Sequence, residues 1–100
     1  MKIEIKENLK GLSGKDLIEN EKSIPLKEVL ANSIVNSKKI EGIDSTLRCH
    51  IIGVELYQTG IMDLKAGERD AIKEFISDKA GFSILVSAQL LEVFKLTEEK

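Results

Sequence analysis

The chain has 100 residues, of which 42% are hydrophobic and 32% charged, which is enough for one compact domain with a single core and too few for two. Fifteen Lys and Arg against seventeen Asp and Glu give a net charge of −2, which rules out the broad basic surface that binds nucleic-acid phosphates. The aromatic content of 4%, with no Trp, argues against base-stacking platforms.

Cysteine usage and apolar segments indicate the compartment. Cys49 is the single cysteine, so it cannot form an internal disulfide, and with His50 as the only histidine it cannot complete a zinc site. The N-terminus lacks the apolar stretch of a signal peptide. The most apolar segment, 82–94, would be about 20 Å long as a helix, shorter than a bilayer of about 30 Å. We therefore expect a cytoplasmic protein with no cofactor, no metal and no membrane contact.

The chain opens with a strand pattern. Residues 2–6 alternate charged and apolar side chains, which predicts a strand with Ile3 and Ile5 on its buried face. A glycine-bracketed turn follows, and residues 16–19 can form a return strand. These features predict an N-terminal β-hairpin within residues 2–19.

Local start and stop signals then define the helices. Pro25 suits a first helical turn, Asp44 or Ser45 can cap a second helix, and Gly60 closes that helix. The predicted helices span residues 25–39, 44–59, 65–80 and 82–96, with a short extended piece at 61–64. The predicted fold is therefore α+β, an N-terminal β-hairpin followed by a compact bundle of about four α-helices in a single domain, 1–100.

The second helix carries apolar residues around more than one stripe, which predicts several packed neighbours rather than a surface position. These residues are Leu47, Ile51, Ile52, Val54 and Leu56. Gly53 in its middle costs about 1 kcal/mol relative to Ala, a cost that close helix packing can offset.

No pattern for catalysis is present. Cys49 and His50 are neighbours, and side chains at neighbouring helical positions point about 100° apart, so the two do not form a dyad. The segment 11–15, Gly-Leu-Ser-Gly-Lys, lacks the spacing of a phosphate loop. We therefore predict that the protein is not an enzyme.

Basic residues supply one candidate ligand site. Arg48 and Arg69 fall in the first turns of predicted helices, where amide N–H groups already favour anions. With Tyr57, Lys38 and Lys39 nearby, they could hold a phosphate or a partner's carboxylate. The alternative, which the sequence alone favours, is that each arginine is a solubilising surface charge.

The last predicted helix is apolar around most of its circumference, so it is either enclosed or part of an interface between copies. Its candidate interface residues are Leu85, Leu90, Leu91 and Phe94. A homo-oligomer would satisfy both interpretations.

The order of residues also resembles a protein group along nearly the whole chain. The resemblance lies in Leu9–Lys15, Ile24–Ile34, Met62-Asp63-Leu64 followed by Glu68 and Ala71-Ile72-Lys73, and Gln89–Glu92. On these segments the chain resembles small, functionally uncharacterised proteins of phages and prophages of low-GC Gram-positive bacteria. The resemblance implies no catalytic residue.

A phage origin, small size and lack of a catalytic constellation together predict a protein that acts by binding. The leading hypothesis is a counter-defence inhibitor that sequesters a host immune signalling nucleotide or blocks a host defence protein. The nucleotide version would use Arg48 or Arg69 in a pocket between subunits, and the protein version an exposed apolar patch. The alternative is a phage replication or transcription accessory protein that acts through protein–protein contacts.

Overall fold

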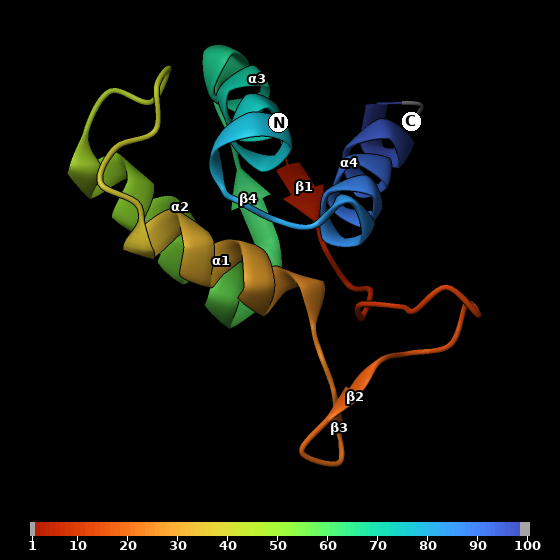
Figure 1. Cartoon of the computed structure of the whole chain (residues 1–100). Helices are drawn as coiled ribbons and strands as arrows, with labels where there is room; N and C mark the ends of the chain where they lie inside the picture. The colour runs from red at the N-terminus through yellow and green to blue at the C-terminus, as the bar shows by residue number, and fades with distance from the viewer. Residues whose placement is uncertain (1, 99–100) are drawn as a thin grey trace.

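The computed structural model describes residues 2–98 and confirms the α+β class (Figure 1). In chain order the elements are β1 (Lys2–Glu4), β2 (Ile18–Glu19), β3 (Lys22–Ser23), α1 (Leu26–Asn36), α2 (Thr46–Thr59), β4 (Ile61–Asp63), α3 (Ala66–Glu74), the π-helix η1 (Phe75–Lys79) and α4 (Ile84–Glu98). Within residues 2–98, a hairpin, β2–β3, precedes the four α-helices, which is the predicted order of elements, but the hairpin lies at residues 18–23 rather than within the predicted 2–19.

The pairing of the first strand differs from the prediction. β1 pairs antiparallel with β4, far along the chain, and not with residues 16–19. Ile3 lies opposite Met62, both are fully buried, and the Ile5 N–H extends the contact by donating to the Gly60 carbonyl at 2.8 Å. Residues 16–19 leave their own apolar side chains in solvent, with Ile18 62% exposed. They turn back on β3 instead.

The ends of α2 follow the predicted signals. The Ser45 hydroxyl accepts a hydrogen bond from the Arg48 N–H at 3.1 Å, which caps the first turn. Gly60 closes the helix in a left-handed conformation at φ 77°, where its N–H donates to the Leu56 carbonyl. The third predicted helix, 65–80, is observed as α3 followed by η1.

The first helix is shorter than predicted. It ends at Asn36 because the Ser37 hydroxyl and N–H both donate to the Ile34 carbonyl, which turns the chain out of the helix. The following segment brings Ile40 and Ile43 into the core, 3% and 4% exposed. Burying these two side chains requires the chain to leave the helical path.

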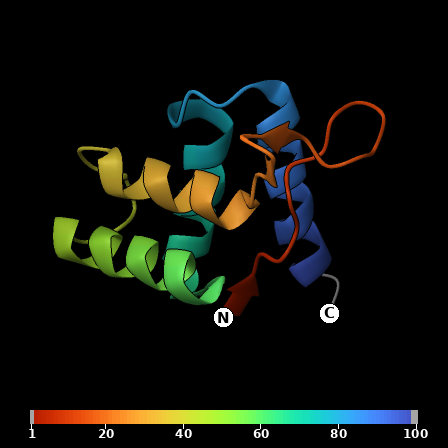
Figure 2. The same cartoon turned by 90° about the horizontal axis from the view of Figure 1, so that it is seen from below.

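The helices α1 and α2 lie side by side as an antiparallel pair (Figure 2). A Cβ on Gly53 would lie 2.5 Å from Cγ1 of Val35, closer than any real contact. The missing side chain at position 53 therefore permits this approach, as the sequence predicts for a glycine within a helix.

The core lies between the α1–α2 pair, the β1–β4 ribbon, α3–η1 and α4. The largest side chains that are at most 2% exposed are Ile3, Ile5, Leu26, Leu30, Ile34, Ile52, Leu56, Met62, Ile72, Ile76, Leu90 and Phe94. Every α-helix and the β1–β4 ribbon contribute to this set, so the chain forms one core around which the surface features are placed.

Candidate functional site

The Arg48 side chain is held by an acidic partner within the same chain. Its Nε donates to Oε2 of Glu68 and its Nη2 to Oε1 of Glu68, each at 2.7 Å. Nη2 also donates to the backbone carbonyl of Asp63 at 2.8 Å. This bidentate ion pair joins the first turn of α2 to the first turn of α3 and to the end of β4.

Glu68 is buried, at 6% exposed, and both oxygens of its carboxylate accept hydrogen bonds. Besides Arg48 it accepts the N–H of Lys65 at 2.9 Å and so caps α3. The hydrogen bond from Arg48 is the main cause that lowers the pKa of Glu68 to about 2, and the same bond raises the pKa of Arg48. Glu68 is therefore ionised at neutral pH and serves as a structural anchor rather than a proton donor.

The other candidate ligand residues do not join Arg48. Tyr57 lies about 13 Å further along the α2 axis, where a hydrogen bond with Glu28 raises its pKa. Lys38 and Lys39 are exposed in the segment after α1, and Arg69 is half-buried on α3. The structure thus distributes the five predicted residues over several surfaces.

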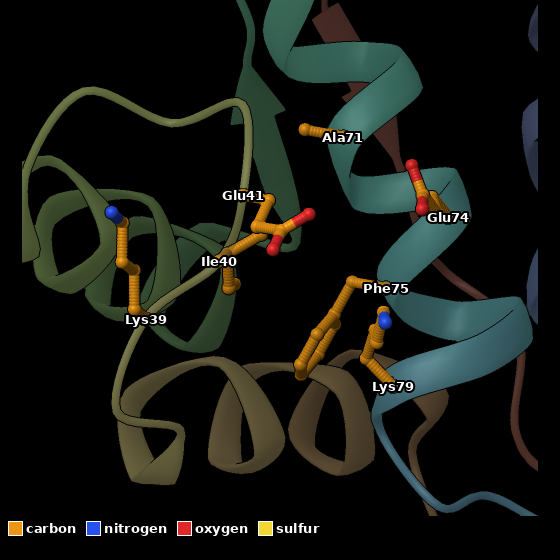
Figure 3. Close-up of a pocket in the computed structure, with 7 residues that line it drawn as sticks. All are labelled: Lys39, Ile40, Glu41, Ala71, Glu74, Phe75 and Lys79. Carbon is orange, nitrogen blue, oxygen red and sulfur yellow. The ribbon is translucent and has the colours of Figure 1, made fainter.

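Lys39 borders a cavity of about 130 Å³ between α3–η1 and the segment after α1 (Figure 3). The residues that line it are Lys39, Ile40, Glu41, Ala71, Glu74, Phe75 and Lys79. Its charged rim contains both signs, and its volume is below the roughly 300 Å³ at which ligand pockets begin. We assign it no ligand.

The apolar residues of α4 are divided between the core and its edge. Leu90 and Phe94 are fully buried within the chain, which corrects their assignment as interface candidates. Leu85 and Leu91 are half-buried, and Leu91 packs against the core. Of the described side chains of α4, Leu90, Val93 and Phe94 are thus enclosed by their own chain, whereas Ile84 at its start is 88% exposed.

A projecting segment, residues 9–25, is the feature that sequence reasoning missed; we call it the arm (Figures 1 and 2). Leu12, in the turn that the Lys10–Asp16 bridge closes, is 99% exposed, and Ile18 is 62% exposed. The Gln89 side chain fixes its root: the Lys10 N–H donates to Gln89 Oε1 at 2.9 Å, and Gln89 Nε2 donates to the Lys10 carbonyl at 2.7 Å. The arm thus presents apolar side chains to solvent from a fixed base.

Hydrogen bonds also fix the arm internally. The Asp16 carboxylate accepts from Asn8 Nδ2 at 3.1 Å and from the Ser23 hydroxyl at 3.3 Å. Backbone bonds connect Leu9 to Ile24 at 2.7 Å. The sequence signal for this surface is Leu12 itself, an apolar residue between two glycines in a turn too short to bury it.

The remaining candidates lie apart from one another. Cys49 is buried on the core face of α2 while the adjacent His50 is exposed. Within residues 2–98, no three His, Cys, Asp or Glu side chains are grouped so that they could hold a metal ion. Over the same residues no helix has the length and apolar character needed to cross a membrane.

Comparison of the chain with protein-family models, with curated proteins and with solved structures finds no match. The resemblance to small phage proteins therefore stays a prediction, and functional conclusions depend on the surfaces described above.

Proposed function

We propose that the protein is a small binding protein that acts by occupying a site on another protein with its arm. The observation that carries this proposal is the arm, which is anchored at Lys10 by Gln89 and exposes the apolar side chains of Leu12 and Ile18. An apolar side chain that is kept in solvent gains free energy when a partner covers it. A loop already fixed in one conformation loses little entropy on binding.

The ion pair between Arg48 and Glu68 favours a protein target over a nucleotide. A phosphate would have to displace the Glu68 carboxylate, which receives two hydrogen bonds of 2.7 Å from the guanidinium and is itself buried. Such a displacement would leave a buried carboxylate without its cation, at a cost of several kcal/mol. Of the two counter-defence mechanisms, we propose the blocking of a host defence protein, because Arg48, one of the two arginines that the nucleotide mechanism could use, is already occupied by Glu68.

The arm suggests how that partner is recognised. In the hairpin, β2 and β3 pair with each other through residues 18–19 and 22–23, and Leu12 lies in a separate turn that the Lys10–Asp16 bridge closes. An apolar pocket of the partner can receive Leu12, while Ile18 packs against its rim. The partner is accordingly a protein with a complementary apolar recess.

Phage plating on bacteria that carry defence systems tests the proposal. Expression of the protein should restore plating on at least one defended strain, and the double variant Leu12→Asp, Ile18→Asp should abolish the effect. Both side chains are exposed, so this variant should keep the wild-type melting temperature. Ser77→Asp, at an exposed position on η1, is the matched control and should act like wild type.

Three results would count against the proposal. Failure to restore plating on any defended strain would reject the counter-defence role. Restoration that survives the arm substitutions would reject the arm as the binding surface. A loss of phage DNA accumulation in undefended cells, when the gene is deleted from a phage that carries it, would favour the accessory-protein alternative.

A further inference from the structure

A second apolar surface, separate from the arm, lies on α2. Opposite the buried side of this helix, four side chains form a line that we call the seam: Leu47, Ile51, Val54 and Gln58. Leu47 is 67% and Ile51 44% exposed, contrary to the expectation that neighbouring elements cover them. Figure 2 shows α2 at the edge of the molecule with α1 along one side.

The spacing of the seam matches the helix of a coiled coil. Its positions follow one another at intervals of four, three and four residues, which is the a/d repeat. Ile51 and Gln58 occupy a positions, and Leu47 and Val54 occupy d positions. Ile51 at a and Leu47 at d are the combination that favours two strands among parallel coiled coils, whereas Gln58 at a and Val54 at d depart from it. A helix is therefore the occupant that the seam fits.

The edges of the seam indicate which helix fits. His50 and Glu55 flank it on opposite sides, at the g and e positions of the repeat. In a parallel, in-register pair, a g residue faces the e residue five positions further along the other helix. His50 of one copy would then face Glu55 of the second, and the same contact would recur by symmetry. An imidazole N–H can donate to a carboxylate, so the two edges complement each other.

We propose that the seam of α2 binds the seam of a second copy, with the two α2 helices parallel about a two-fold axis. This inference does not depend on the proposed function, because it leaves the arm free. The seam spans residues 47–58, about 17 Å of helix. Its four side chains are far fewer than the roughly 20–30 residues that each partner contributes to a standard stable interface. The dimer should therefore dissociate on dilution and form at high protein concentration.

Two measurements on the full chain test this arrangement. Sedimentation equilibrium at submillimolar concentration should show dimer for wild type and monomer for the double variant Leu47→Ser, Ile51→Ser, which should retain the wild-type circular dichroism spectrum. Under mild oxidation, Gln58→Cys should yield a disulfide-linked dimer, because parallel pairing places the two thiols across the axis. Wild type, whose only cysteine is the buried Cys49, is the blank, and Ser77→Cys is the matched control.

Each alternative result overturns the proposal. A wild-type chain that stays monomeric at submillimolar concentration would show that no second copy binds. A dimer that survives the Leu47→Ser, Ile51→Ser substitutions would place the interface elsewhere. Equal cross-linking of Gln58→Cys and Ser77→Cys, or none from Gln58→Cys in a chain that dimerises, would reject the parallel pairing.

Discussion

The carboxylate of Glu68 stabilises two helices at once, since it caps α3 and pairs with Arg48 of α2. Replacing it by Gln would leave the Arg48 guanidinium, 23% exposed, without its counter-charge. We expect Glu68→Gln to lower the free energy of unfolding by about 2–3 kcal/mol, somewhat less than a fully buried pair costs. Urea titration at neutral pH measures this change, and Glu74→Gln at an exposed α3 position is the control.

The same carboxyl should make stability depend on pH in the acid range. The pKa of Glu68 is about 2 in the folded chain and 4.5 in its ordinary environment. A carboxyl whose pKa is lower in the folded chain than in the unfolded chain stabilises the folded chain. This stabilisation is complete when the pH is above the unfolded-state pKa, and it is lost as the pH falls through the folded-state pKa. The advantage of wild type over Glu68→Gln should thus be constant above about pH 4.5 and shrink towards pH 2. A difference that does not change over this window would contradict the pairing with Arg48.

Among the elements, the arm contains a turn that its sequence does not favour. Asn20 and Glu21 connect β2 to β3 with φ of 52° and 66°, the left-handed conformations of a two-residue hairpin turn. Asn is suited to the first position, whereas a side chain such as that of Glu costs about 1 kcal/mol at the second. Glu21→Gly should therefore slow amide exchange in the arm. Glu19→Gly, which removes a strand side chain, should accelerate it.

The close packing of α1 against α2 can be tested by adding a side chain at position 53. Gly53→Ala places a methyl group 2.5 Å from Cγ1 of Val35. We expect this substitution to destabilise the chain by about 1 kcal/mol, because the overlap outweighs the gain in helix propensity. In a Val35→Ala background the space is free, and the same substitution should stabilise by up to about 1 kcal/mol. A double-mutant cycle with no coupling would show that Val35 simply moves away.

At the scale of the whole molecule, what the sequence could predict depends on how far apart the interacting residues are. Ser45 and Gly60 act on their own neighbours, so the two ends of α2 could be predicted within a few residues. By contrast, β1 pairs with β4 and Arg48 pairs with Glu68, and in each case many residues separate the two partners along the chain. Several apolar segments could cover Ile3, and several carboxylates could pair with Arg48, so only the packed chain selects Met62 and Glu68.

The exposed surfaces were harder to predict for a related reason. A hydrophobic pattern identifies side chains that avoid water, but it does not say whether the same chain or a partner covers them. Leu90 and Leu47 are both apolar residues on helices with several apolar faces, yet one is fully buried and the other 67% exposed. The difference arises from where β1 and α3–η1 pack, which no local pattern encodes.

This contrast between Leu90 and Leu47 can be measured. Leu90→Ala removes a fully buried side chain and should lower the free energy of unfolding by about 2–5 kcal/mol, because the surrounding core cannot collapse completely into the space. It should leave the mass in solution unchanged wherever the protein stays folded. Leu47→Ala should have little effect on the free energy of unfolding but should shift the protein from dimer towards monomer. Denaturant unfolding and sedimentation of both variants would distinguish core from interface, and a change in self-association from Leu90→Ala without loss of stability would return the interface to α4.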